Sequence, residues 1–273
     1  MKNKRRSATV YIILTLVSLV MILPLWWMIN TSLKDPTKVF TFQFIPHPFR
    51  WKNYLDVLDT TPFHLFYWNS IYIAVLTTLG VLLFASLAGY AFARMQFPGR
   101  NILFLCLLST MMIPTEIITI PLFLLMRNLG LVDTHVPLIV IPMLGPAGVF
   151  GVFVMRQYFL AIPYELEEAA KMDGCSHIRI FFSIMLPLAK PALATLTIFT
   201  FLTSWNEFYE PLIYINSQEL MTLPLALARF TDEVGTHWER LMSASVMATV
   251  PLLIVFFFAQ KQFIEGISMT GGK

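Results

Sequence analysis

The chain has 273 residues, of which 57% are hydrophobic and only 13% are charged, and its formal net charge is +3. A water-soluble domain carries about 25% charged residues, so this composition excludes an ordinary soluble globular protein. The mean hydropathy of +0.69 indicates that lipid surrounds most of the chain.

Six apolar stretches are long enough to cross a bilayer as a helix, which takes about 20 residues. The first follows a basic tail (residues 1–9) and therefore resembles a secretory signal peptide. Its length, the presence of Pro24 and the lack of a small-residue cleavage site favour an uncleaved helix instead. The spans are predicted at residues 10–30, 69–93, 102–125, 136–155, 191–215 and 243–263, followed by a tail at 264–273.

These spans predict an all-α integral membrane protein with six transmembrane helices in one domain (residues 10–263). None has a charge at its centre, and the short alternating strands of a barrel are absent from the sequence. Twelve of the 19 Lys and Arg residues fall in segments on the same side as the N-terminus. The positive-inside rule therefore places both tails and the long segment 156–190 in the cytoplasm.

Small residues and prolines predict the shape of two spans. Ala85, Gly89 and Ala93 recur every four residues, which is the pattern of closely packed membrane helices. Pro114 and Pro121 are expected to kink the third span.

The cytoplasmic segment 156–190 is a polar island between two apolar spans. Its glutamates, from Glu165 to Glu168, fall in the first turn of a short predicted helix, where the helix dipole favours carboxylates. Gly174 is expected to end this helix in the left-handed conformation, and Ser176 to cap a second helix leading back to the membrane. A helix lying on lipid headgroups is the alternative, but its polar face would be basic. The acidic first turn favours a docking element for a cytoplasmic protein.

The sequence contains no motif for catalysis or nucleotide binding. Its five histidines are scattered without metal-ligand spacing. The terminal GGK lacks the spacing of a phosphate-binding loop. We therefore predict no catalytic residue, no metal site and no cofactor bound by this chain, so that any energy source belongs to a partner.

A cluster of polar residues in the fifth span is the best candidate for a substrate path, because polar groups inside a bilayer usually face a cavity or a partner. Asn206 and Glu210 are four residues apart and are expected to share a helical face, with Glu207 and Tyr209 beside them. Carboxylates, amides and aromatic rings suit a polyhydroxylated ligand. Glu116 in the third span is a further candidate. The alternative is that the cluster belongs to the aromatic belt at the outer membrane surface.

The polar island resembles the EAA pattern of ABC importer permeases. The pattern reads Glu168-Ala169-Ala170, three residues, Gly174, nine residues, Ile184, one residue, and Leu186-Pro187. The runs IPYELEEAAKMDG, LPLAKPALAT and SWNEFYEPLIYI resemble the MalG-like carbohydrate-uptake branch of this family of binding-protein-dependent inner-membrane components.

This resemblance implies the type I importer permease fold and a division of labour. A second homologous (MalF-like) permease would complete the pore, and an extracytoplasmic sugar-binding protein would deliver the solute. Two copies of a cytoplasmic ABC ATPase would bind ATP and Mg²⁺ and dock on the EAA loops. The resemblance assigns the following residues to ATPase coupling: Glu165, Glu168, Ala169, Ala170, Asp173, Gly174, Ile184, Leu186 and Pro187.

The expected function is that of the permease subunit of an ATP-driven carbohydrate importer in a bacterial or archaeal cytoplasmic (inner) membrane, with lipid but no nucleic acid as a further partner. An importer of glycerol phosphate or another polar solute would share these motifs, although phosphate would favour Arg or Lys in the pore. A self-contained secondary transporter would require internal repeats or buried ionisable relays, and the sequence has no clear repeat. The sugar, its chain length, its contact with this subunit, the partners' identities and the type of anchoring of the binding protein stay open at this stage.

Overall fold

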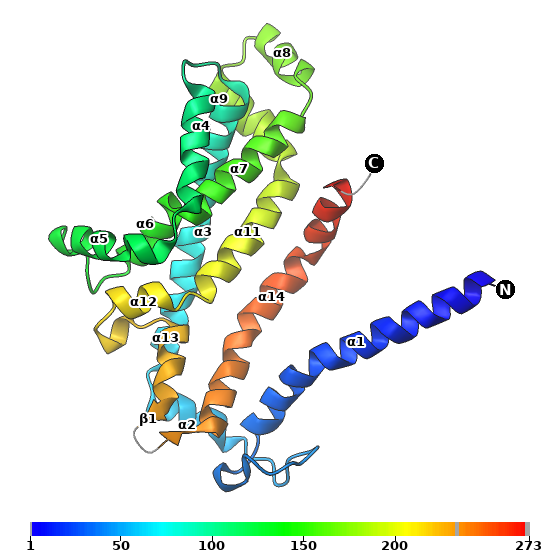
Figure 1. Ribbon diagram of the computed structural model, residues 1–273, viewed down its shortest axis with the longest axis vertical. Helices are drawn as coiled ribbons and strands as arrows, with labels where there is room; N and C mark the ends of the chain where they lie inside the picture. Colours follow the sequence, from blue (N-terminus) through cyan, green and yellow to red (C-terminus); the bar gives the residue numbers. More distant parts are fainter. Residues whose placement is uncertain (1, 233–234, 271–273) are drawn as a thin grey trace. The chain divides into compact units, whose positions relative to one another are not determined.

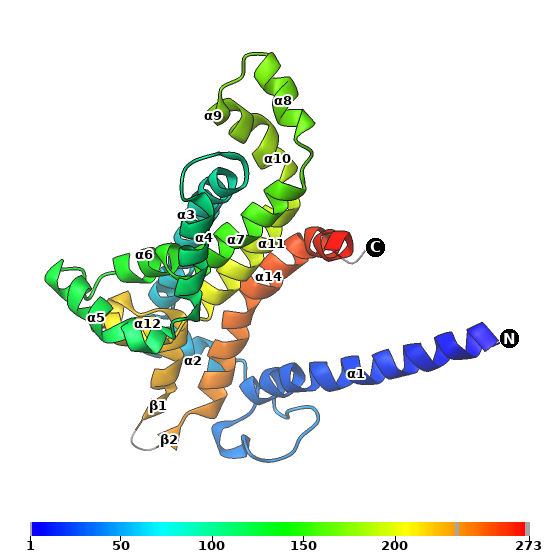
Figure 2. The ribbon, with the colours of Figure 1, turned by 45° about the horizontal axis from the view of Figure 1, so that its top comes forward.

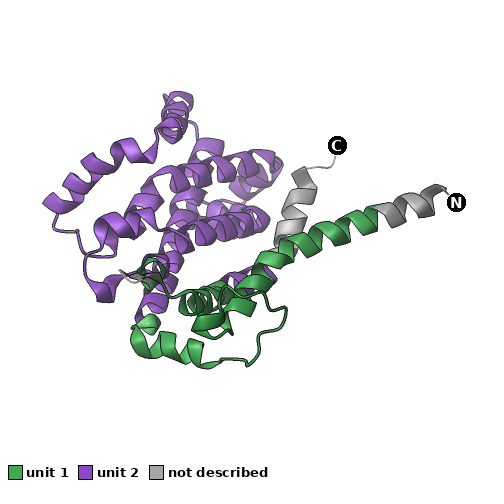
Figure 3. Cartoon of the chain, turned by 60° about the horizontal axis from the view of Figure 1, so that its bottom comes forward, with its two compact units in different colours: residues 1–64, 226–251 green, residues 65–225, 252–273 purple. Residues whose placement is uncertain are grey.

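The computed structural model describes residues 2–232 and 235–270, with side chains described for residues 10–230 and 236–257. Helices make up nearly all regular structure in this part of the chain (Figure 1). The chain divides into two compact units, residues 1–64 with 226–251 and residues 65–225 with 252–273 (Figure 3). The candidate functional residues of the sequence all lie in the second unit.

The first unit is built around the end of a long apolar helix. Asn53 donates from its amide nitrogen to the carbonyl oxygens of Ser32 and Lys34, at 2.8 Å each, and so joins α2 (Lys52–Thr60) to the end of α1 (Lys2–Ser32). The two short strands form an antiparallel pair. The regular elements that lie wholly or partly in this unit are α1 (Lys2–Ser32), α2 (Lys52–Thr60), β1 (Thr231–Asp232), β2 (Gly235–Thr236) and α14 (Trp238–Thr270).

The second unit is a bundle in which four helices lie alongside one another (Figures 1 and 2): α3 (Phe63–Arg94), α4 (Arg100–Ser109), α7 (Pro146–Ala161) and α11 (Lys190–Trp205). At one end of the bundle the chain leaves it to form α8 and α9, and then returns through a π-helical turn at Phe181–Met185. The helices are α3 (Phe63–Arg94), α4 (Arg100–Ser109), α5 (Thr115–Asn128), α6 (Val136–Leu144), α7 (Pro146–Ala161), α8 (Glu165–Met172), α9 (His177–Ile180), α10 (Leu186–Leu188), α11 (Lys190–Trp205), α12 (Tyr209–Tyr214) and α13 (Leu223–Leu227).

The helices supply four to six candidate membrane spans among the described residues, which agrees with the all-helical membrane fold predicted. Four are long and apolar enough to cross singly: Val10–Ser32, Phe63–Arg94, Val136–Ala161 and Trp238–Phe257. Two further pairs of helices pass the same criteria but are bent, by 99° between Met112 and Thr115 and by 76° between Leu188 and Lys190. The first bend includes Pro114, so the kink predicted there is confirmed, whereas α5 continues through Pro121.

Close packing of α3 against α7 confirms the prediction from the small residues of the second span. Ala85 and Ala93 are buried. A Cβ atom on Gly89 would lie 2.7 Å from the Cβ of Met155 and 2.9 Å from the backbone nitrogen of Arg156, so only glycine permits this approach. The two helices therefore meet nearly backbone to backbone.

The Asp133 carboxylate joins two segments of the second unit, the loop between α5 and α6 and the segment that follows α12. Asp133, in the loop between α5 and α6, accepts hydrogen bonds from the backbone N–H groups of Asn216 and Ser217 at 2.9 and 2.8 Å. It also accepts one from the Ser217 hydroxyl, and its own N–H donates to the carbonyl of Tyr214. The Ser217 hydroxyl, followed by the two N–H groups, lowers the pKa of Asp133 below its ordinary value.

We expect Asp133→Asn to lower the thermal unfolding midpoint at neutral pH, with a difference from wild type that shrinks as the pH falls. A depressed folded-state pKa contributes stability above the unfolded pKa of about 3.9, and this stability is lost as the pH falls through the folded-state pKa. Unfolding midpoints of the detergent-purified chain between pH 7 and pH 3 measure the effect. A difference independent of pH would contradict it.

Candidate functional site

The acidic helix predicted in the polar island is α8, at one end of the second unit (Figure 2). Glu165, Glu167 and Glu168 all lie in its first turn, where they face the positive end of the helix dipole. Only two of the eight residues of α8, Glu167 and Ala170, are buried. The helix therefore presents most of its surface outward, as a docking element must.

The turn after α8 has the predicted conformation. Gly174 has φ of +76°, its N–H donates to the carbonyl of Lys171 at 2.9 Å, and the N–H of Cys175 donates to the carbonyl of Ala170 at 3.0 Å. This pair of bonds is the Schellman arrangement that ends a helix at a left-handed residue. Ser176 then caps α9 by accepting from the N–H of Arg179. The predictions for Gly174 and Ser176 are thus confirmed.

The residues of the EAA pattern divide into an outer face and a supporting face. Ala170 is buried in a core that also contains Tyr90 and Phe159, and Ile184 and Leu186 pack against the same core. Because it is buried by this chain's own core, Ala170 does not offer its side chain to a partner. The exposed members, which form the outer face, are Glu165, Glu168, Ala169, Asp173, Gly174 and Pro187.

One charged residue of the island has a structural partner that the sequence analysis missed. Glu167 lies 3.2 Å from Arg94 at the end of α3, and both side chains are 1% exposed. A helical wheel drawn for α8 would have placed Glu167 on the same face as Ala170, three residues later. That face is the one turned towards the bundle.

A cavity of about 160 Å³ lies elsewhere in the second unit, among α3, α5, α6, α7, α11 and α12. Glu207 and Glu210 line it together with six hydroxyl side chains and six apolar residues. Glu210 is half-buried, and its buried Oε2 is without a hydrogen-bond partner among the described residues. The hydroxyl residues of the lining are Thr77, Thr115, Thr200, Thr203, Ser204 and Thr222.

The structure brings together only part of the predicted substrate cluster. α11 ends at Trp205 and α12 begins at Tyr209, so Asn206 and Glu210 do not share a helical face as expected. Glu207 causes this break, because its Oε1 accepts hydrogen bonds from the N–H groups of Tyr209 and Glu210 and so starts a new helix.

The remaining candidates lie outside the cavity lining. Asn206 is exposed and its amide donates to the carbonyl of Leu202 at 2.7 Å. Tyr209 and Glu116 are exposed as well. Thr115, next to Glu116, does line the cavity.

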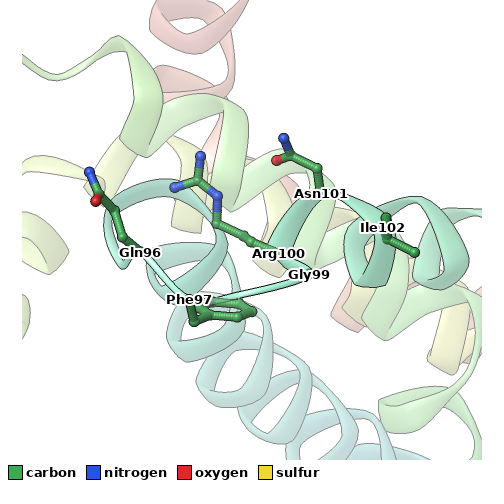
Figure 4. Close-up of a pocket in the computed structure, with 6 residues that line it drawn as sticks. All are labelled: Gln96, Phe97, Gly99, Arg100, Asn101 and Ile102. Atoms are coloured by element: carbon green, nitrogen blue, oxygen red, sulfur yellow. The ribbon is translucent and has the colours of Figure 1, made fainter.

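A larger hollow, of about 460 Å³, lies on the loop between α3 and α4 (Figure 4). Six residues between Gln96 and Ile102 line it, around Gly99 and Arg100. The lining comes only from the loop between α3 and α4 and the first turn of α4, and it contains none of the candidate residues, so we assign the hollow no functional role. Among the described residues, no group of three or more His, Cys, Asp or Glu side chains could hold a metal ion.

The profile of the family described as "Binding-protein-dependent transport system inner membrane component" matches residues 82–268. The arabinooligosaccharides transport system permease protein AraQ of Halalkalibacterium halodurans is 37% identical over 94% of this chain and 93% of its own length. The sn-glycerol-3-phosphate transport system permease protein UgpE of Yersinia pestis is 30% identical over 98% of both chains. A chain in the crystal structure of a bacterial ABC transporter that imports the acidic polysaccharide alginate superposes with a TM-score of 0.84, at 25% identity, over 96% of this chain and 98% of the other.

Proposed function

This chain belongs to the family of binding-protein-dependent transport system inner membrane components, and on that premise we propose that it forms one half of the pore of an ATP-driven importer of di- or oligosaccharides. It is a multi-pass inner-membrane permease of an ABC importer, a transport subunit without catalytic activity that works with an ATPase and a binding protein. The proposal adds a second, homologous permease and two ATPase copies, which bind ATP and Mg²⁺.

The observation that carries the coupling role is the exposed acidic face of α8. Glu165, Glu168 and Ala169 face outward at the end of the bundle, and the turn at Gly174 fixes where the helix stops. We propose that this face binds the ATPase and that closure of the ATPase dimer on ATP displaces α8. Transport then follows because the ATPase contacts α8 differently in the two pore conformations, which shifts their populations.

The substrate class is supported by the lining of the cavity. Carboxylates and hydroxyls offer hydrogen bonds to sugar hydroxyls, and hydrogen bonds to a charged group are the stronger kind. A glycerol phosphate importer is the second candidate, favoured by the similarity to UgpE. However, no Lys or Arg occurs among the described residues that line the cavity, so the lining offers no cation to balance the charge of a phosphate. The lining therefore favours a neutral, polyhydroxylated solute.

The test is uptake by proteoliposomes that contain this chain, the partner permease and the ATPase, with the binding protein outside. We expect ATP-dependent uptake of labelled oligosaccharides, arabino-oligosaccharides first, and little uptake of sn-glycerol 3-phosphate. Preferential uptake of the phosphate would favour the second candidate. Uptake by this chain alone without ATP would overturn the importer assignment.

Replacement of Glu210 tests the cavity as the sugar path. We expect Glu210→Ala to raise the KM for uptake roughly tenfold, because a polar group left without its hydrogen-bond partner costs about 1–3 kcal/mol and about 1.4 kcal/mol is tenfold. ATPase binding should be unchanged. Asp59→Ala, which removes an exposed carboxylate on α2, is the matched control. An unchanged KM in Glu210→Ala would remove the cavity from the sugar path.

A further inference from the structure

The structure assigns a positioning role to Arg94 and Glu167: we propose that their buried ion pair holds α8 on the end of α3 and transmits the movement of α8 to the pore. The inference rests on the proposed function, in which the ATPase moves α8. Neither residue belongs to the EAA pattern.

The first observation is that, apart from this ion pair, few buried side chains attach α8 to the bundle. Glu167 and Ala170 are its only buried residues, and an alanine offers one methyl group. Among the described residues, neither carboxylate oxygen of Glu167 has a hydrogen-bond partner, so Arg94 is the group that balances its charge. A displacement of α8 without α3 would therefore separate two charges in a dry environment, which is costly.

The second observation is that Arg94 joins three helices. Its Nη2 donates to the carbonyl oxygens of Phe159, in the last turn of α7, and Ile162, just beyond it. Its guanidinium lies 4.3 Å from the centre of the Tyr164 ring, directly before α8. Arg94 itself is the last residue of α3. The ends of α3 and α7 and the start of α8 thus meet on one side chain.

The third observation is where α3 leads. Ile73 and Thr77, also on α3, line the cavity. Arg94 lies seventeen positions after Thr77 on the same continuous helix, a distance of about 26 Å at 1.5 Å per residue. Movement of α8 therefore reaches the cavity wall along a single helix, without crossing a loop.

Stability alone does not explain the pair. A buried ion pair is weak support for stability, because well-packed apolar side chains of similar volume often serve as well or better. What the ion pair adds is a unique position, since only one placement of α8 brings Glu167 to Arg94. A uniquely placed helix is what a mechanical link between ATPase and pore requires.

The experiment is a double-mutant cycle in the reconstituted complex, with Glu167→Gln, Arg94→Met and the double variant. The quantity measured is sugar imported per ATP hydrolysed, together with the amount of ATPase that co-purifies. We expect each single variant to lower the ratio at least tenfold while co-purification stays within twofold, because the outer face of α8 is unaltered. The double variant should be no worse than the poorer single variant, because the two residues act as one unit. Asp59→Asn is the control.

Two results would overturn the inference: an unchanged ratio per assembled complex in the single variants, or effects that multiply in the double variant. If the single variants fail to accumulate, the double variant with Arg94→Met and Glu167→Leu takes their place, because it leaves no unpaired buried charge. A normal ratio of sugar imported to ATP hydrolysed in that double variant would also overturn the inference. Failure of the wild-type complex to import with ATP would overturn the proposed function together with this inference. If the wild-type complex imports sugar with ATP and the Arg94 and Glu167 variants import as well as wild type, only this inference is overturned.

Discussion

Replacing Gly174 by valine should abolish ATP-driven uptake while leaving the chain in the membrane. Gly174 has φ of +76°, and a Cβ atom there would meet nothing within 4 Å, so the cost is backbone strain and not crowding. For a β-branched residue that strain is about 1–3 kcal/mol, and it falls on the turn that ends α8. Relief of the strain displaces α8 from the position in which we propose that it meets the ATPase. Uptake and membrane content, measured on the same vesicles, test this result.

A matched control exists within the chain. Gly130 ends α5 with φ of +68° and has open space around its Cβ position. The turn has the same two hydrogen bonds, from the N–H of Gly130 to the carbonyl of Arg127 and from the N–H of Leu131 to the carbonyl of Met126. Gly130→Val imposes similar strain far from α8 and should retain most uptake. Gly174→Asn should be tolerated better than valine, because asparagine accepts the left-handed conformation. Equal loss in Gly130→Val and Gly174→Val would show that general folding, not coupling, was damaged.

Tryptophan at Ala169 and at Ala170 should produce two different failures. Ala169 is exposed on α8, so under the proposed docking Ala169→Trp should leave the fold intact and block the approach of the ATPase, with at least a tenfold loss of co-purified ATPase. Ala170 is 6% exposed, within the core that contains Tyr90 and Phe159. Overpacking a core costs about 1–3 kcal/mol or more, so Ala170→Trp should reduce the amount of permease itself.

The comparison separates docking from packing on adjacent residues. Permease content by immunoblot and ATPase content after affinity purification are the two measurements. Normal ATPase recovery with Ala169→Trp would remove this face of α8 from the interface. Normal permease content with Ala170→Trp would contradict the buried placement of that side chain.

Local features of the site were predictable from sequence, because they depend on neighbours in the chain. The left-handed Gly174, the cap at Ser176 and the bend at Pro114 each follow from the conformational preferences of one residue. The acidic first turn of α8 is likewise a local pattern.

Features that depend on distant residues were not predictable in this way. The burial of Glu167 requires Arg94, which is 73 positions earlier in the chain, and no periodicity in the island identifies that partner. The prediction that Asn206 and Glu210 share a helical face was wrong for another reason. The Glu207 side chain competes for the backbone N–H groups that would have continued the helix. In both cases a glutamate side chain makes contacts that composition alone does not reveal.

The close approach of α3 and α7 at Gly89 has a consequence for engineering the substrate range of this protein. Because these helices meet nearly backbone to backbone, any larger side chain at that contact must push them apart. The α3 residues of the cavity lining, Ile73 and Thr77, lie on this same closely packed helix, so under the coupling proposed above we expect changes there to disturb energy coupling along with selectivity. The α12 wall, with Glu210 and Pro211, is where we expect a library of variants to alter the accepted solute at the lowest cost in activity.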